Sequence, residues 1–263
     1  MEKIIFTDLD GTIKEKNKPL TDFCNKVFFN LTKRGVLIVP TTGRDRTRAE
    51  DFTKGYGGSN YIITSNGANV FDTKLRKDIY TKPMNKTSVE KIVEYTLQQG
   101  CKASINVNAD FKFSTDIEHL KENEKPLNSF EDLKDFLVFQ VVVQGISNLK
   151  FDDFKATITS VDDVKIGNVC GEDDNHSLDV VDKNVEKGQA VKFLLNYLKI
   201  DKSQSMVFGN DFNDISMFKE VGKSFCVENS IEKLKPLATQ TIGSVFEDGV
   251  PKFLVDYFNL NKN

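Results

Sequence analysis

Short apolar runs alternate with amphipathic stretches of helical period at both ends of the chain, and this alternation constrains the fold more than any other feature. Residues 3–7 and 36–41 are predicted to be buried strands, with a helix over residues 20–33 between them. The C-terminal third repeats the pattern, with a helix over residues 187–198 and a strand over residues 205–208. Because such alternation typically builds a parallel sheet with helices on both faces, we predict an α/β fold.

The middle of the chain, from about residue 83 to residue 182, has a different pattern of predicted helices and strands. One helix is expected over residues 88–98, and strands are expected over residues 103–107, 139–143, 164–169 and 178–181. We therefore predict a discontinuous parallel-sheet core, residues 1–82 and 183–263, split by an inserted α+β domain of residues 83–182. The hinges are expected near residues 81–86 and 182–188.

Two further elements are predicted just before the insertion. Residues 61–65 form a third strand, closed by Asn66 and Gly67, a pair that is also typical of a simple tight turn. Residues 69–81 are predicted to form a hairpin in which Val70-Phe71 faces Ile79-Tyr80.

Composition limits the possible partners. The 263 residues carry 36 Lys and Arg against 39 Asp and Glu, a net charge of −3, so the chain lacks the basic field of a nucleic-acid or membrane-surface protein. The four cysteines show neither a CxxC pair nor metal-ligand spacing, which is typical of reduced thiols. We expect a cytoplasmic protein that binds neither nucleic acid nor membrane and is a monomer or a weak homodimer.

The strongest local signal is a pair of carboxylates, Asp8 and Asp10, directly after the first apolar strand and before Gly11. In an open parallel sheet, ligands bind beyond the carboxyl ends of the strands, so both side chains belong at that edge. Such a pair suits a hard divalent cation, or a division of work between a nucleophile and an acid/base. A polar strand end or a helix cap is the alternative, which the preceding strand and the following Gly-Thr disfavour.

Polar residues follow the other predicted strands as well. After the second strand, the hydroxyl and guanidinium of Thr42-Gly43-Arg44 can bind a phosphate oxygen, although Thr-Gly is also common in turns. After the strand at residues 205–208 comes an acidic cluster over residues 210–214, which suits a metal shell or simply caps the next helix. Lys187 begins a helix after the insertion, and by itself it would be taken for a surface lysine.

An acid pair, a threonine, a lysine and an acidic cluster in this order resemble the haloacid dehalogenase-like (HAD) superfamily of phosphatases, in particular its Cof-type members with a type IIB cap. The resemblance covers essentially the whole chain and implies a Rossmann-like core with an inserted cap. It implies that Asp8 attacks phosphorus to give an aspartyl-phosphate, that Asp10 is the acid/base, and that Thr42 and Lys187 hold the phosphoryl oxygens. The implied activity is Mg²⁺-dependent hydrolysis of small phosphorylated metabolites, most simply sugar phosphates.

The same resemblance places the remaining site residues. Contacts to the substrate are expected from Gly43, Arg44, Asn66 and Asn213, and Asp179 is added from its place in the strand that leads back toward Lys187. The expected metal set comprises Asp8, Asp10, Asn210, Asp211 and Asp214.

One position departs from the family pattern, because Asn210 stands where these proteins usually carry a metal-binding aspartate. Either Asn210 ligates through its amide oxygen or Asp211 reaches the metal, with Asp214 in support. A neutral ligand should weaken Mg²⁺ binding without abolishing it.

Other functions stay open beside the phosphatase. A phosphomutase on the same scaffold needs a second anion site, and the absence of arginine from residues 83–181 speaks against it, although lysines could serve. A receiver-like phosphoacceptor switch would be about one domain long and would lack the insertion. A catalytically weakened protein that only binds phospho-ligands is favoured by Asn210 alone, whereas the retained Asp8 and Asp10 favour an enzyme.

Overall fold

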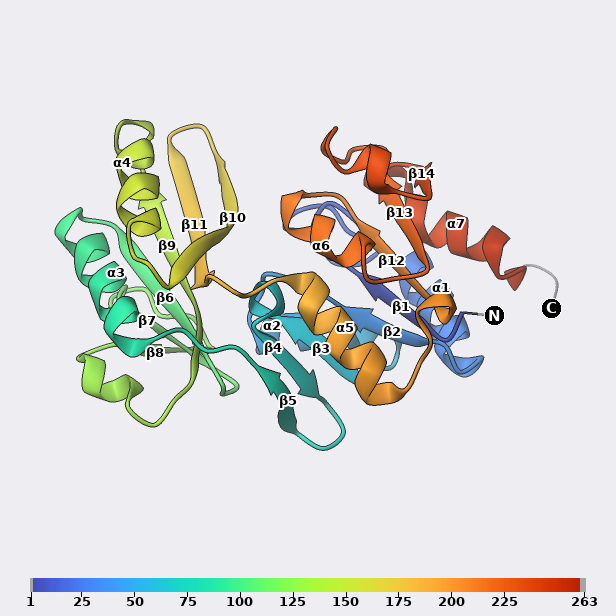
Figure 1. The fold of residues 1–263 in the computed structure, drawn as a ribbon, viewed down its shortest axis with the longest axis horizontal. Coiled ribbons are helices and arrows are strands. Elements are labelled where there is room, and N and C mark those ends of the chain that lie inside the picture. Colours follow the sequence, from blue (N-terminus) through green and yellow to red (C-terminus); the bar gives the residue numbers. More distant parts are fainter. Residues whose placement is uncertain (1, 261–263) are drawn as a thin grey trace.

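The computed structural model describes residues 2–260 and shows two lobes joined by two crossings of the chain (Figure 1). The larger lobe holds a parallel sheet and both ends of the described chain, and the smaller lobe holds a mostly antiparallel sheet with two helices. The chain leaves the larger lobe after β5 (Lys77–Thr81) and returns at α5 (Lys187–Leu198). The predicted fold class, a parallel-sheet core with an inserted α+β cap, is confirmed.

The parallel sheet has the strand order β14–β13–β12–β1–β2. Its strands are β1 (Ile4–Thr7), β2 (Leu37–Pro40), β12 (Ser205–Gly209), β13 (Lys223–Val227) and β14 (Gln240–Ile242). Neighbouring strands run parallel throughout, and Thr7 lies opposite both Pro40 and Phe208. The central β1 therefore delivers the residues that follow it beside those that follow β2 and β12.

Helices cover both faces of this sheet because successive strand residues point to opposite sides. Ile5 and Phe208 pack with α1 and α7 on one face, and Phe6 and Val207 pack with α5 on the other. The helices of this lobe, besides α5, are α1 (Asp22–Lys33), α2 (Arg46–Asp51), α6 (Ile215–Phe218) and α7 (Gly249–Tyr257).

A three-stranded antiparallel sheet adjoins the edge of β2. It consists of β3 (Tyr61–Thr64), β4 (Asn69–Asp72) and β5, and β3 contacts the edge of the parallel sheet through one parallel bridge between Thr41 and Ile63. The predicted hairpin is present, and Val70 faces Tyr80 as expected. Phe71 faces Asp78 instead of Ile79, however, because a bulge shifts the register between these two pairs.

The smaller lobe is built on a six-stranded sheet, called the cap sheet below, with the order β10–β11–β9–β6–β7–β8. Its strands are β6 (Lys102–Val107), β7 (Lys112–Ser114), β8 (Glu124–Pro126), β9 (Val138–Ile146), β10 (Val164–Glu172) and β11 (Asn175–Asp182). Its helices are α3 (Lys86–Gln98) and α4 (Asn148–Thr159). The sequence did not predict α4, whose buried residues are only Phe154 and Ile158.

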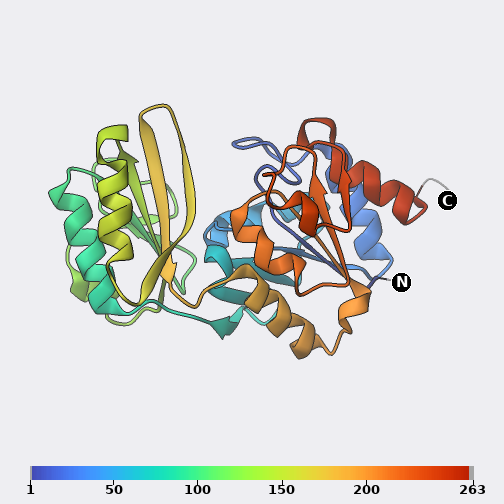
Figure 2. The ribbon, with the colours of Figure 1, turned by 45° about the horizontal axis from the view of Figure 1, so that its top comes forward.

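The two faces of the cap sheet differ in polarity. One face carries Ile105, Val141 and Leu178, which are buried in the apolar core that α3 and α4 cover. These helices lie on the side of the sheet away from the larger lobe (Figure 2). The opposite face carries Asn106 and Gln140 and borders a cleft shared with the larger lobe. The sheet thus presents polar side chains to the carboxyl ends of the parallel strands.

Two sequence expectations concern membrane and redox context. Within residues 2–260, none of the helices has the length and apolar character that crossing a bilayer requires. All four cysteines are free thiols, and Cys24, Cys101 and Cys226 are buried.

Candidate active site

The two carboxylates of the acid pair lie at the carboxyl end of β1 and border the same cleft. The backbone N–H of Asp8 donates to the carbonyl of Phe208 at 3.0 Å, so the chain stays in register with β12 up to this residue. Gly11 then turns the chain away with a φ of 80°. Asp8 is buried, whereas Asp10 is partly exposed.

Lys187 is held between two carboxylates. Its Nζ atom donates to Oδ1 of Asp8 and to Oδ1 of Asp214, both at 2.7 Å. Burial raises the pKa of Asp8 to about 7, against the lowering effect of the Lys187 charge and with a further rise from the nearby Asp214. For Lys187, burial acts to lower the pKa, but Asp214 and Asp8 outweigh it and raise the pKa above the usual value. Lys187 is therefore an ammonium at neutral pH. It contacts Asp8, the nucleophile expected from the sequence.

Both oxygens of Asp214 are engaged in hydrogen bonds. While Oδ1 accepts from Lys187, Oδ2 accepts from the backbone N–H groups of Asn210 at 2.8 Å and Asp211 at 3.1 Å. The side chain is completely buried. Expected as a metal ligand, Asp214 in this arrangement positions Lys187 and the turn that follows β12.

The segment after β2 is tied both to β3 and to the acid pair. The N–H of Thr42 donates to the carbonyl of Ile63 at 2.9 Å, which leaves the Thr42 hydroxyl at the edge of the cleft. The Arg44 guanidinium donates to both oxygens of Asp10, at 2.6 and 2.8 Å. Gly43 lies against the cap sheet, since a Cβ atom there would be 3.0 Å from Oδ2 of Asp179. The structure thus brings the predicted phosphate-binding segment, the acid pair and one cap residue together.

Asp10 has a second cationic partner that the sequence analysis did not single out. Nζ of Lys14, a side chain with no exposed surface, donates to Oδ1 of Asp10 at 2.6 Å. Burial acts to raise the pKa of Asp10, but the hydrogen bonds and charge of Arg44, followed by those of Lys14, outweigh it and lower the pKa. Asp10 is therefore ionised in this arrangement.

Asn210 and Asp211, the alternative metal ligands, both border the cleft. Oδ1 of Asn210 accepts from the Thr12 hydroxyl at 2.8 Å, and its amide nitrogen would be 2.5 Å from a Cβ atom at position 11. Only a glycine at position 11 leaves room for this side chain beneath the turn after β1. Asp211 accepts from the N–H of Phe212 at 2.7 Å and caps the short 3₁₀ helix over Phe212–Asp214. Both residues therefore have structural partners as well as access to the cleft.

The donor set fits a hydrated magnesium ion. In the described part of the chain, no three Asp, Glu, His or Cys side chains gather closely enough to enclose a metal by themselves. Asp214 is committed to hydrogen bonds, and the neighbouring position is the amide Asn210. Of the predicted ligands, Asp8, Asn210 and Asp211 border the cleft, and so does Asp10, whose oxygens accept from Arg44 and Lys14. Mg²⁺ keeps several water ligands and commonly uses only one or two carboxylates plus substrate phosphate, so this set is sufficient.

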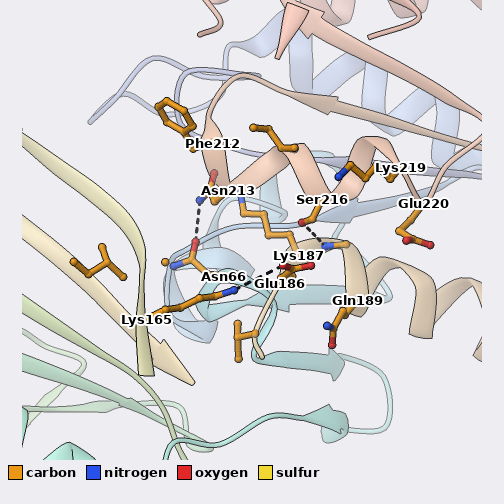
Figure 3. A pocket seen from close by; sticks show the side chains of 15 residues that line it. Asn66, Lys165, Glu186, Lys187, Gln189, Phe212, Asn213, Ser216, Lys219 and Glu220 are labelled. Atoms are coloured by element: carbon orange, nitrogen blue, oxygen red, sulfur yellow. Dashed lines mark hydrogen bonds and ion pairs between the residues drawn. The ribbon is translucent and has the colours of Figure 1, made fainter. Parts of the chain in front are cut away.

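Asn66 links the two lobes. Ser65, Asn66 and Gly67 all have positive φ values, of 48°, 59° and 99°, and this turn aims the Asn66 amide toward the cap sheet. Its nitrogen donates to Oδ2 of Asp179 at 3.0 Å, and its oxygen accepts from the amide of Asn213 at 2.9 Å. Figure 3 shows the Asn66–Asn213 pair beside a second cavity of about 400 Å³ next to α5. Asn66 and Asn213, expected to bind substrate, here bind each other at the junction of the lobes.

Asp179 lies where the sequence analysis expected it, on the cap side of the cleft. Burial raises its pKa to about 6, while the hydrogen bond from Asn66 and the charge of Lys187 act to lower it. The carboxylate accepts from Asn66 and lies close to Gly43, so it contacts the larger lobe from the cap side.

The cleft has a volume of about 480 Å³ and includes residues that the sequence analysis missed. These are Arg48 from the larger lobe and Asn106, Lys112 and Gln140 from the cap sheet. A signal was present for one of them, because Gln140 interrupts the most apolar stretch of the chain. Since Arg44 and Arg48 of the larger lobe reach this cleft, the absence of arginine from residues 83–181 says little about a second anion.

The fold and these strand-end side chains define a capped α/β enzyme whose reactive groups lie between a parallel sheet and an inserted lobe. The sequence matches the haloacid dehalogenase-like hydrolase family over residues 5–254. The chain belongs to this family, as the motifs predicted.

Known proteins similar to this chain include two named phosphatases and one solved structure. The phosphoglycolate phosphatase of Methanobrevibacter smithii is 24% identical, over 94% of each chain. The 5-amino-6-(5-phospho-D-ribitylamino)uracil phosphatase of Bacillus subtilis is 23% identical, over 98% of each. A haloacid dehalogenase-like hydrolase from Bacteroides thetaiotaomicron has the same fold, with a TM-score of 0.84 at 18% identity over 98% of this chain and all of that one.

Proposed function

We propose that this protein is a Mg²⁺-dependent phosphatase that hydrolyses small phosphate monoesters through an aspartyl-phosphate on Asp8. The observation that carries the proposal is the buried contact of 2.7 Å between Lys187 and Asp8, at the end of the central strand, with Asp10 two residues further on. A nucleophilic carboxylate, a second carboxylate and a fixed cation at one strand edge are what phosphoryl transfer requires. The phosphatase names of the relatives support the same reaction class.

The residues divide the reaction as follows. Once Arg44 has turned to the phosphoryl group, Asp10 takes up a proton from solvent. An Asp8 oxygen then attacks phosphorus, the bond to the leaving oxygen breaks, and Asp10 gives this proton to the leaving oxygen. Asp10 then accepts a proton from water, the water oxygen attacks the phosphorus of the aspartyl-phosphate, and Asp8 and inorganic phosphate are released. Thr42 and Lys187 hold the phosphoryl oxygens and balance their charge. When bound by Asp8 and by Asn210 or Asp211, Mg²⁺ neutralises charge on the phosphate.

Asp10 must exchange partners during this cycle. In the free protein its two oxygens are occupied by Arg44 and Lys14. A substrate phosphoryl group carries up to two negative charges and attracts the Arg44 guanidinium, because Arg binds phosphate through a planar pair of donors. We assign Arg44 to this exchange, so that Asp10 is released toward the leaving oxygen when substrate is present.

We assign residues 83–182 to the cap, with hinges at residues 81–86 and 182–188. The cap sheet covers the carboxyl ends of the parallel strands and supplies Asp179, Asn106 and Gln140 to the cleft. Leaving groups are therefore selected by the cap and are small, since the whole cleft holds about 480 Å³. Sugar phosphates fit the polar lining.

The test is phosphate release from a panel of sugar phosphates and an aryl phosphate, with and without Mg²⁺. Asp8→Asn is the blank, because it keeps the shape of the side chain and removes the nucleophile. We expect release that requires Mg²⁺ and falls to background in Asp8→Asn. Equal release by wild type and Asp8→Asn would move the nucleophile elsewhere.

The amide at position 210 favours one other function, a phospho-ligand binding protein with weakened catalysis. It removes a negative charge from the metal side of the cleft, which lowers Mg²⁺ affinity. Two results together would establish this function instead. The folded protein would release no phosphate from any ester of the panel at saturating Mg²⁺, and sugar phosphates would stabilise it against heat.

A further inference from the structure

Asn229 joins the turn after β1 to the C-terminal part of the chain. Its Nδ2 atom donates to the carbonyl of Gly11 at 2.8 Å. Its Oδ1 atom accepts from the N–H of Val245 at 3.0 Å and from the Ser244 hydroxyl at 3.2 Å. In the described chain, Asn229 does not border the cleft, whereas Gly11 does. Both ends of one carboxamide are thus engaged, and one of them contacts the turn that carries Asp10.

The orientation of the Gly11 peptide depends on hydrogen bonds. Gly11 has a φ of 80°, and without a side chain its backbone is free to adopt many other conformations. Its N–H donates to the carbonyl of Lys14 at 2.8 Å, a contact inside the turn, while its carbonyl accepts from Asn229, outside the turn. Because Asp10 directly precedes Gly11, a shift of this peptide moves the carboxylate to which we assign the acid/base role.

The two residues that follow Asn229 hold the turn after β12 in the same way. The Ser230 hydroxyl donates to the carbonyl of Gly209 at 3.3 Å, and the N–H of Ile231 donates to the carbonyl of Asn210 at 3.0 Å. Three consecutive residues after β13 therefore contact both strand-end turns that border the cleft. Their spacing sets the distance between the turn of the acid pair and the turn that carries Asn210.

We propose that Asn229 is a positioning residue for phosphoryl transfer, which through Gly11 fixes Asp10 relative to the turn that carries Asn210. The inference rests on the proposed phosphatase function and adds to it a residue outside the cleft. A displacement of about 1 Å in a reacting group can lower a rate about 100-fold, so the hydrogen bond to Gly11 should act on turnover. Binding of the phosphoryl group is assigned to other residues and should change little.

Two variants of Asn229 test the proposal. Asn229→Asp keeps an oxygen that accepts from Val245 and Ser244, but it replaces the donor to the Gly11 carbonyl with an oxygen that cannot donate. Asn229→Ala removes the donor without adding a charge. The side chain is exposed, so both variants should fold. Ser244→Ala is the matched control, because it removes a hydrogen bond to the same carboxamide and leaves the contact with Gly11 in place.

The kinetic measurement uses the sugar phosphate that the wild type hydrolyses fastest, at saturating Mg²⁺. Both Asn229 variants should lower kcat by about tenfold or more and change KM by less than about threefold. Ser244→Ala should match the wild type in both constants. Unchanged kcat in the Asn229 variants, a raised KM without a fall in kcat, or an equal fall in Ser244→Ala would overturn the proposal. A fall in Asn229→Asp alone would be an effect of the added charge and would overturn it as well.

Amide hydrogen exchange of the free protein separates this inference from the proposed function. The N–H groups of residues 11–14 all donate to carbonyls within the turn, so their exchange reports how firmly the turn is held. Both Asn229 variants should speed this exchange by about five- to tenfold, the scale of one hydrogen bond, and Ser244→Ala should not. If the wild type releases no phosphate, the proposed function fails, and faster exchange still supports Asn229 as the residue that fixes the turn. Unchanged exchange would reject that role even if phosphate is released.

Discussion

Asp214 accepts a hydrogen bond of 2.7 Å from Lys187, and neither side chain has any exposed surface. The same ammonium donates to Asp8, so one cation serves two buried carboxylates. Burial of unpaired charges is expensive, and here the cost is offset only while the ammonium stays in place. Lys187, to which we assign the binding of the phosphoryl group, therefore also stabilises the fold.

Replacing Lys187 with Met should lower the free energy of unfolding by about 3–5 kcal/mol near neutral pH, because it leaves Asp8 and Asp214 buried without their cation. Urea unfolding measures the loss. Lys192→Met is the control, since Lys192 is exposed on the same helix and should change stability by less than about 0.5 kcal/mol. The loss should shrink near pH 5, where the orphaned Asp8 carboxyl is protonated, because burial raises its pKa. Equal stability of the two variants would refute the shared-cation arrangement.

Introducing a carboxylate with Asn210→Asp should strengthen Mg²⁺ binding by about tenfold, since it adds a charged hard ligand next to Asp8. Without Mg²⁺ the same variant should melt at a lower temperature than wild type, because the new charge repels Asp8 and Asp10. Melting curves across a Mg²⁺ titration should therefore cross. The control is Asn213→Asp, which changes the amide that binds Asn66. An unchanged titration in Asn210→Asp would assign the metal to Asp211.

The Asp179 carboxyl should lower the stability of the folded protein as the pH rises. Burial raises its pKa from 3.8 to about 6 in the folded protein. A raised folded-state pKa means that the contribution to stability is full below about pH 4 and is lost as pH rises through about 6. Asp179→Asn, which keeps an oxygen for Asn66, should therefore be more stable than wild type by about 1–2 kcal/mol near pH 8 and equal to it near pH 4.

Thermal unfolding at the two pH values checks the Asp179 prediction. Asp173→Asn is its control, because Asp173 is exposed in the turn of the same hairpin. A gain of equal size at both pH values would show that the effect has another cause.

A contact between the lobes offers a further test. The Asp110 carboxylate, in the loop after β6, lies 3.0 Å from Arg46 and 3.0 Å from Arg76, both on the larger lobe. Asp110→Ala should raise KM by about three- to tenfold, because the cap is held less firmly over the cleft. The melting temperature should change by less than about 2 °C, since Asp110 is exposed and such ion pairs add little stability. Asp116→Ala, which removes an ion pair within the cap, should leave KM unchanged.

The sequence predicted the features that depend on local pattern. Short apolar runs located the strands that precede Asp8 and Thr42 and the strand that leads to Gly209, and the topology of a parallel sheet brings those ends together. Helix α4 escaped prediction because its exposed face includes Leu149, which blurs the apolar stripe.

The local pattern of a sequence does not show which distant strands pair, or in which register. A row of Lys112, Asn106 and Gln140 exists only through the register of β7, β6 and β9, which is set by packing across the sheet. The partners of Arg44 and Lys14 likewise depend on side-chain geometry at Asp10. Family resemblance supplied the roles of the site residues, and the structure added which of them are engaged with one another.

The central position of β1 has a consequence for biosynthesis. Its two neighbours are β2, made early, and β12, made after the whole cap sheet. On the ribosome, β1 and β2 therefore wait with an open edge while residues 102–182 emerge and complete a sheet of their own. In a nascent chain stalled before residue 205, the edge of β1 that pairs with β12 is unpaired, and an unpaired strand edge invites aggregation.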